Sequence, residues 1–112
     1  MADTATAAMA PLTVVTFPAE IDMATASAIG DEVAAALARG VHAVIADMTA
    51  TTFCDSAGIN MLIRAKKQAT AYGAELRVLL PCRNVLRVFK MQGVDAVLPI
   101  YLNLEEALAG AG

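Results

Sequence analysis

The feature that most constrains the fold is a regular alternation of short apolar runs with longer segments of helical periodicity. Four runs rich in β-branched or apolar residues read as strands: 12–17, 41–48, 76–80 and 97–101. Helical patterns occupy residues 24–38, 57–72, 81–93 and a short segment after residue 103. Strands that alternate with helices form a largely parallel sheet with crossover helices. The sequence therefore predicts an α/β fold with one sheet of four or five strands and about four helices.

Glycine and proline residues mark where several of these elements stop or start. Gly40 and Gly73 follow the first two helical patterns, where a residue free of Cβ commonly ends a helix. Pro81 is predicted in the first turn of the third helix, where its missing N–H costs no hydrogen bond. Pro99 cannot donate to a ladder, so the last strand is expected at a sheet edge. Asn103 is expected to cap the terminal helix.

A chain of 112 residues has room for one core, so residues 12–110 are predicted to form one domain. Residues 1–11 are expected to be a tail or an edge strand. No apolar run is long enough to span a bilayer, and no signal peptide is recognisable, so a cytoplasmic location is expected. The net charge of −3 argues against general binding to nucleic acid or to anionic membranes. Cys54 and Cys82 are expected to be reduced thiols rather than a disulfide.

The segment 51–58 (TTFCDSAG) is the strongest candidate for a functional site. It lies between a buried strand and a basic helical segment, and open α/β sheets place their sites at the carboxyl ends of strands. Two interpretations of its polar residues stay open. Asp55 or Ser56 is simply a helix N-cap, which is the commoner role for such residues. Alternatively, Ser56 presents its hydroxyl to another protein.

The residues around Ser56 do not favour catalysis by this chain. A nucleophile elbow needs glycine two positions before the serine, and Cys54 stands there. The single histidine, His42, is predicted at the opposite end of the preceding strand, out of reach of Ser56. No catalytic residue, and therefore no enzyme activity, is expected.

No cofactor and no metal are expected either. Asp22, Asp47 and Asp55 could converge on a divalent cation, but the chain has no ligand cluster of recognised spacing and no phosphate-binding glycine loop. The basic residues Arg83, Arg87 and Lys90 follow helical spacing, which usually indicates a solvated helix face.

A serine at a helix start is a sensitive position for a change of charge. Phosphorylation would add about −1.5 to −2 charge units and three acceptor oxygens. The helix terminus favours an anion, whereas Asp55 and the nearby Glu20 and Asp22 repel it. A partner that packs against Ser56 would therefore be expelled while the fold survives.

From about Leu12 to Leu108 the sequence resembles the STAS domain family, and within it the bacterial anti-sigma factor antagonists. The resemblance is carried by Glu20-Ile21-Asp22 with Thr25, and by residues 53–58 (FCDSAG), which are similar to the family's Asp-Ser-[Ser/Ala]-Gly motif. It is also carried by Gly73 before a short strand and by residues 81–93 (PCRNVLRVFKMQG), similar to the family's Pro-x₆-Phe-x₃-Gly helix.

The resemblance implies that Ser56 is a phosphorylation site and that its surroundings bind a partner. The implied partner is an anti-sigma factor with serine kinase activity, and a separate phosphatase would act on phosphorylated Ser56. The partner-binding residues implied are Glu20, Asp22, Thr25, Asp55, Ala57, Gly58, Ile59, Asn60 and Arg64. The rival expectation is a constitutive STAS adaptor in a transport or stress-signalling complex, without phosphorylation.

The chain departs from the family pattern before the Glu-Ile-Asp triplet. The family usually has glycine there, and this chain has Pro18-Ala19. Proline fixes one φ angle and alanine disfavours positive φ, so the loop that carries Asp22 is expected to differ in shape.

Overall fold

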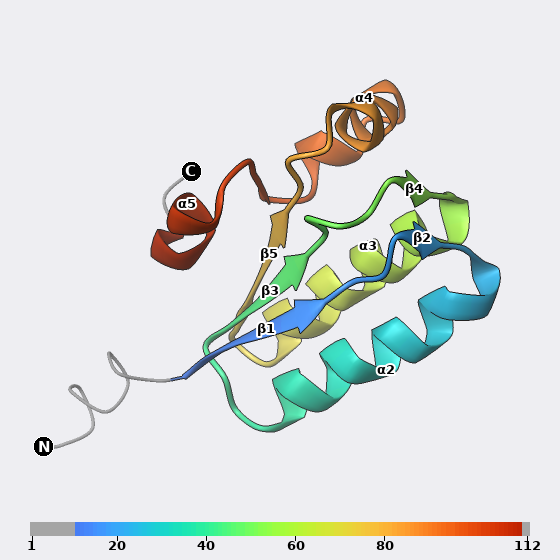
Figure 1. Ribbon diagram of the computed structural model, residues 1–112. Helices are drawn as coiled ribbons and strands as arrows, with labels where there is room; N and C mark the ends of the chain where they lie inside the picture. Colours follow the sequence, from blue (N-terminus) through green and yellow to red (C-terminus); the bar gives the residue numbers. More distant parts are fainter. Residues whose placement is uncertain (1–10, 111–112) are drawn as a thin grey trace, which may run out of the picture.

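The structure is a computed structural model that describes residues 11–110. Its main sheet has four parallel strands in the order β1-β3-β5-β6. These strands are β1 (Leu12–Thr16), β3 (Ala43–Asp47), β5 (Glu75–Leu79) and β6 (Ile100–Tyr101). Figure 1 labels the first three of them. The helices are α2 (Met23–Ala38), α3 (Ser56–Ala71), α4 (Arg83–Met91) and α5 (Leu104–Ala109), with a 3₁₀ turn at Val94–Ala96. The predicted α/β fold with a parallel four-stranded sheet and four helices is confirmed.

The two faces of the sheet pack against different helices, as alternation along β3 requires. Val44 and Ala46 join the main core, to which α2, α3 and α4 contribute. Ile45, between them, faces the other side and packs with Leu79, Tyr101 and Ala107 of α5. Helices on both faces explain why residues 43–46 are buried without a polar alternation.

A second, very small sheet was not predicted. Strands β2 (Glu20–Ile21) and β4 (Phe53–Cys54) pair in parallel, apart from the main sheet. The expectation of only one sheet is therefore wrong, because a two-residue strand is too short to leave an alternation in the sequence.

The predicted boundaries are less accurate in the last third of the chain. The strand predicted at 97–101 contains only Ile100 and Tyr101, because the amides of Val97 and Leu98 donate to the Val94 carbonyl oxygen of the preceding 3₁₀ turn. The strand does lie at the sheet edge, as Pro99 suggested. Pro81 precedes the N-cap residue Cys82 and so lies outside the first turn of α4. Asn103 caps α5 as predicted: its Oδ1 accepts a hydrogen bond from the Glu106 amide, 2.9 Å away.

A buried arginine in β5 forms hydrogen bonds to α5 and so holds this helix against the sheet. Arg77 in β5 donates from Nη1 to the carbonyl oxygens of Ala107 and Leu108, both at 3.0 Å. Its Nε donates to the Glu75 carboxylate at 3.1 Å. These bonds satisfy carbonyls that the end of a helix leaves without intrahelical partners.

Two remaining expectations concern the termini and the cysteines. A tail or an edge strand was expected at residues 1–11, of which residues 1–10 lie outside the described residues. None of the helices within residues 11–110 has the length and hydropathy of a membrane-spanning segment. Both cysteines are free thiols, as expected, with Cys54 buried and Cys82 partly buried.

Candidate functional site

The small sheet places the starts of two helices side by side. In its register Glu20 lies opposite Phe53, and Ile21 lies opposite Cys54. Each strand is followed by an aspartate and then by a helix, so α2 and α3 begin at the same end of the molecule (Figure 1). The amide of Asp55 continues the pairing by donating to the Ile21 carbonyl oxygen at 3.0 Å.

Asp22 is the N-cap of α2. Its carboxylate accepts hydrogen bonds from the amides of Ala24 at 2.9 Å and Thr25 at 3.0 Å. The Thr25 hydroxyl oxygen accepts from the Asp22 amide at 3.0 Å, which completes a capping box. Pro18-Ala19 therefore does not prevent a well-formed helix start. Glu20, the other acidic residue of this loop, is exposed.

Asp55 is the N-cap of α3. Its carboxylate accepts from the amides of Ala57 at 2.9 Å and Gly58 at 3.3 Å. Ser56 is then the first residue of the helix, where its hydroxyl is not needed as a cap. Of the two candidates for the cap left open by the sequence, the structure selects Asp55.

The Ser56 side chain is exposed. Within residues 11–110 its hydroxyl makes no hydrogen bond, although polar side chains nearby, such as Thr25 and Asp55, are engaged. The oxygen can therefore be reached by another protein without breaking an internal contact.

Gly58 and Ile59, both in the implied partner surface, are buried. A Cβ atom at Gly58 would lie 2.6 Å from Cys54 Sγ and 2.7 Å from Ile21 Cγ2, closer than such atoms approach one another. The first turn of α3 therefore needs glycine in order to pack against β2 and β4. Both residues pack beneath the surface that carries Ser56, and their burial keeps them from contacting a partner directly.

Cys54 lies two positions before Ser56 but is poorly suited to act as a nucleophile. Burial, with a further contribution from the negative charge of Asp55, raises the pKa of the Cys54 thiol to about 11. The thiol therefore remains protonated at neutral pH, and the thiolate is the reactive form.

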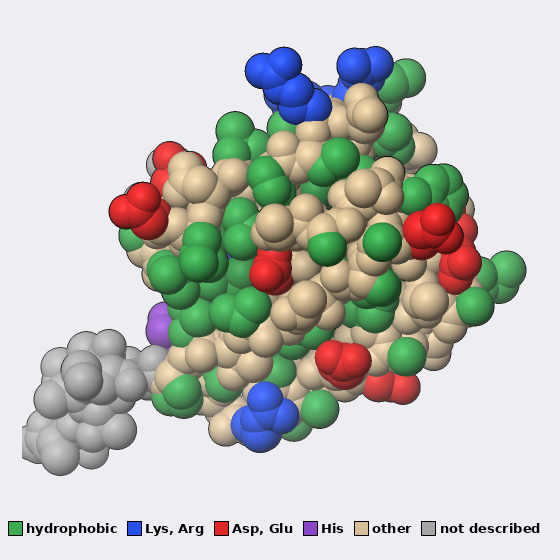
Figure 2. All heavy atoms as spheres, viewed as in Figure 1, with side chains coloured by type: hydrophobic (Ala, Val, Ile, Leu, Met, Phe, Trp, Pro, Cys, Tyr) green, Lys and Arg blue, Asp and Glu red, His purple; other side chains and the backbone are tan. Residues whose placement is uncertain are grey.

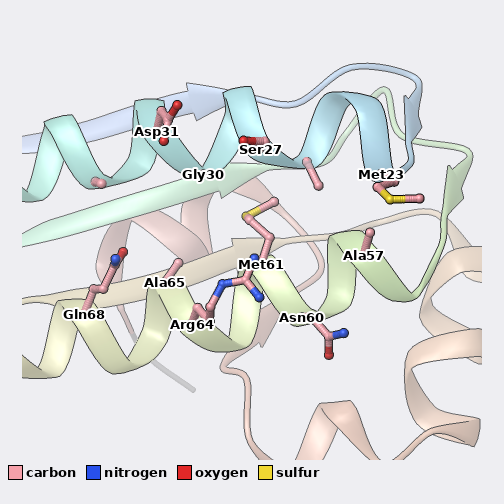
Figure 3. A pocket seen from close by; sticks show the side chains of 12 residues that line it. Met23, Ser27, Gly30, Asp31, Ala57, Asn60, Met61, Arg64, Ala65 and Gln68 are labelled. Atoms are coloured by element: carbon pink, nitrogen blue, oxygen red, sulfur yellow. The ribbon is translucent and has the colours of Figure 1, made fainter.

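A groove between α2 and α3 leads away from Ser56 (Figure 3). Its volume is about 440 Å³. The α3 wall carries Ala57, Asn60 and Arg64, three of the predicted partner residues, and the α2 wall carries Met23, Ser27 and Asp31. In Figure 3 the Met61 side chain extends from α3 toward α2, whereas Asn60 and Asp31 lie at the outer edges of the two helices. The predicted residues Ala57, Asn60 and Arg64 thus share one surface that extends from the Ser56 turn.

The α2 wall of this groove was missed by the sequence analysis. Met23, Ser27 and Asp31 recur at i, i+4 and i+8, which places them on one helix face. One methionine and two polar residues at this spacing also fit an ordinary solvent-facing stripe, so the pattern does not by itself indicate a groove. Met23 begins α2 as Ser56 begins α3, and its side chain is 79% exposed.

Charge is unevenly distributed over the surface. Figure 2 shows Lys and Arg side chains gathered over α4, and acidic side chains at several places on this face, among them the end of the molecule that carries β2 and β4. Phe53 adds an apolar side chain, 51% exposed, three residues before Ser56. The surface around Ser56 is therefore partly apolar and lined by carboxylates, with no basic residue in the first turn of α3.

The positions of His42 and Asp47 fit neither a serine–histidine catalytic pair nor a metal site. His42 directly precedes β3, whereas Ser56 follows the loop at the carboxyl end of that strand, so the two residues lie at opposite ends. The His42 ring Nδ1 lies 3.1 Å from the Pro11 carbonyl oxygen. Asp47 accepts a hydrogen bond from the Thr49 amide at 3.0 Å and so shapes a turn. Among residues 11–110, no cluster of three potential metal ligands occurs.

The chain is similar to one known protein family and to several solved structures. The model of the STAS domain family matches residues 4–107. No curated protein sequence matches the chain. Among solved structures, an anti-sigma factor antagonist from Mycobacterium paratuberculosis is 28% identical, with 87% of this chain and 82% of that chain covered and a TM-score of 0.72.

Two further structures show the same fold at lower identity. A putative anti-sigma factor antagonist from Thermotoga maritima is 20% identical, covering 87% of this chain and 86% of that one, with a TM-score of 0.75. The Bacillus cell fate determinant SpoIIAA in its phosphorylated form is 22% identical, covering 89% of this chain and 91% of that one, with a TM-score of 0.64. The family match covers nearly the whole sequence, and the resemblance stated from its motifs is confirmed: the chain belongs to the STAS domain family.

Proposed function

We propose that this protein is an anti-sigma factor antagonist whose binding to its partner is switched by phosphorylation of Ser56. The observation that carries the proposal is the exposed Ser56 hydroxyl at the first position of α3, which has no internal partner in residues 11–110. Unphosphorylated, the protein binds an anti-sigma factor with serine kinase activity and keeps it from its sigma factor. The chain acts as a binding module, and the chemistry belongs to its partners.

Phosphorylation changes the electrostatics of the surface more than the fold. The phosphate adds about −1.5 to −2 charge units at a helix N-terminus, which tolerates an anion. Asp55 already occupies the amides of Ala57 and Gly58, so a phosphate on Ser56 cannot replace it as the cap. The added charge therefore remains on the surface, next to a carboxylate.

A docked partner would feel this charge directly. The two apolar side chains that flank the site, Met23 and Phe53, would be buried in a complex, and burial of a phosphate beside them costs desolvation free energy. The carboxylates of Asp55 and Asp22 add like-charge repulsion. Together these terms favour release of the partner when Ser56 is phosphorylated.

Two of the similar solved structures support this assignment through the proteins that they represent. The mycobacterial structure is that of an anti-sigma factor antagonist, and SpoIIAA has been solved in unphosphorylated and phosphorylated forms. In the cycle that we propose, a phosphatase removes the phosphate from Ser56 and restores binding. Partners that regulate transcription place the protein in the cytoplasm.

The decisive experiment is phosphorylation by the cognate anti-sigma kinase with ATP, followed by mass-spectrometric mapping of the site. The chain has one other serine, Ser27, which is also exposed and lies in the same groove. Ser56→Ala should abolish incorporation of phosphate, whereas Ser27→Ala should leave it unchanged. Phosphate on Ser27 or on a threonine of the wild-type protein would refute the assignment.

The alternative is a constitutive STAS adaptor of a transport or stress-signalling complex. That function predicts a partner whose affinity is the same for wild-type protein and for Ser56→Asp. Binding measured for both proteins therefore separates the two functions without requiring the kinase reaction.

A further inference from the structure

A second cavity lies away from Ser56, between the later turns of α3 and the segment that follows α4. Its volume is about 620 Å³. Ile63, Lys66, Lys67 and Thr70 of α3 form one wall, at positions i, i+3, i+4 and i+7 on a single helix face. Ala96, Val97 and Leu98 form the opposite wall.

The inner part of this cavity is apolar. Leu98 belongs to the main core, and Ile63 packs against it. Val97 lies on the wall and is 50% exposed, which is unfavourable for a branched aliphatic side chain that could be covered. An aliphatic ligand would therefore find hydrocarbon on both walls and would cover Val97.

The polar part of the cavity is cationic. Lys66 and Lys67 both line it, and α3 contains no acidic residue. Within residues 11–110 the one ion pair joins Arg77 to Glu75, so neither lysine is neutralised by a carboxylate. The Thr70 hydroxyl is engaged by the Lys66 carbonyl oxygen at 3.1 Å.

Asp95, beside Ala96, is the acidic residue of the opposite segment, and it is not part of the wall. Glu75 lines a neighbouring pocket together with Lys66 and Thr70, but its carboxylate pairs with Arg77. Two ammonium groups without ion-pair partners, next to a hydrocarbon-lined space, complement a ligand that has a negative head and an aliphatic tail.

We propose that this cavity binds a single-chain amphiphilic anion such as an alkyl carboxylate. Its head group lies between Lys66 and Lys67, and its chain lies against Ile63, Val97 and Leu98. Lys67 is eleven residues along α3 from Ser56, or about 16 Å at the rise of an α-helix. The cavity is therefore a separate site, and the proposal does not depend on phosphorylation of Ser56.

The test is titration of the full chain with octanoate, at concentrations at which octanoate is monomeric, followed by ¹H–¹⁵N NMR and calorimetry. The changes in backbone amide chemical shift should be largest at Ile63, Lys67 and Val97. Butyrate lacks four methylene groups and should bind at least about tenfold more weakly. The neutral analogue 1-octanol should also bind several-fold more weakly, because it offers the lysines no charge.

Matched variants separate the cationic site from general electrostatics. The double variant Lys66→Met/Lys67→Met should weaken octanoate binding by about tenfold or more, whereas Lys66→Arg/Lys67→Arg should retain it. Lys90→Met, on the exposed face of α4, should have no effect. A bulky side chain in Ala96→Trp should block the cavity and abolish the shifts.

Several outcomes would overturn the proposal. Equal affinity for butyrate and octanoate would show that the apolar walls do not contribute to binding. Unchanged octanoate affinity of the double methionine variant would show that the two lysines do not contribute. Shifts centred on another surface would also refute it. Binding to phosphatidylglycerol vesicles without binding to monomeric octanoate would indicate a membrane surface instead of a cavity for one chain.

Discussion

The backbone amide of Asp55 donates a hydrogen bond to the carbonyl oxygen of Ile21 over 3.0 Å, and this bond joins the starts of α3 and α2. It extends the two-residue pairing of β2 with β4 by one step. Because Asp55 also caps α3, the bond fixes the position of Ser56 relative to Met23 and the groove. The phosphorylation site that we propose thus lies at the start of α3, and a backbone hydrogen bond fixes this helix start relative to the start of α2.

Ser56→Asp should prevent partner binding without loss of stability. A carboxylate at the first helical position is favourable with respect to the helix dipole, which offsets its repulsion by Asp55. The thermal midpoint should therefore change little, while affinity for the anti-sigma factor falls by a factor of at least about ten. Calorimetry and a binding assay on the same preparation test both parts. A variant that unfolds would show that Ser56 has a structural role.

Asp55→Ala should destabilise the protein by about 1 kcal/mol, because loss of an N-cap leaves the amides of Ala57 and Gly58 without their acceptor. Ser56→Ala removes no internal hydrogen bond in the described structure and should stay within about 0.5 kcal/mol of the wild type. Urea unfolding of both variants gives the comparison. Equal losses would contradict the assignment of Asp55 as the cap.

Gly58→Ala should destabilise the protein by about 1–3 kcal/mol through overpacking against Cys54 and Ile21. The double variant Gly58→Ala/Cys54→Ala should recover part of this loss, since it removes the sulfur that lies 2.6 Å from the added Cβ. Gly30→Ala is the matched control: its Cβ would meet only the flexible Met61 side chain, at 3.1 Å. If both single variants were equally stable, the close packing beneath Ser56 would be disproved.

The three central strands and the position of Ser56 could be predicted from local sequence, whereas the small sheet could not. The strands β1, β3 and β5 were predictable because continuous apolar runs report burial on both faces. Ser56 was found through local chemistry and a motif, since Asp-Ser at the start of a helical pattern is a local signal. The pairing of Ile21 with Cys54 is a contact between distant segments, and a two-residue strand carries no periodicity that reveals it.

The groove and the second cavity were hidden for a related reason. Each is formed by two segments far apart in the sequence, Met23–Asp31 with Ala57–Gln68 in one case and Ile63–Thr70 with Ala96–Leu98 in the other. The sequence shows each wall separately, as a stripe on a helix or as a loop. Only the packing of one wall against the other distinguishes a site from a solvated face. For the same reason, Gly58 and Ile59 looked like contact residues until their burial was known.

Cys54 should resist alkylation in the folded protein up to strongly alkaline pH. Its pKa is raised from an ordinary value of 9.0 to about 11, chiefly by burial, so the folded state retains the proton where the unfolded state has lost it. The stability associated with this proton is fully present below pH 9 and is lost as the pH rises through 11. Iodoacetamide at pH 8 should label Cys82, which is partly buried, faster than Cys54. The opposite order, read by mass spectrometry, would contradict the raised pKa.

Arg64→Glu should weaken binding of the anti-sigma factor if the groove forms part of the docking surface. Arg64 lies on the α3 wall, exposed, with Asp31 on the α2 wall of the same groove. Reversal of its charge beside a carboxylate changes the potential of the groove, and we expect a loss of affinity of about tenfold or more. Arg83→Glu makes the same change of charge on the exposed face of α4, outside the groove, and should leave the affinity within about twofold. If both variants weaken binding equally, net charge rather than the groove determines affinity. If only Arg83→Glu weakens binding, the partner docks on α4. That result would contradict a docking surface formed by the groove beside Ser56.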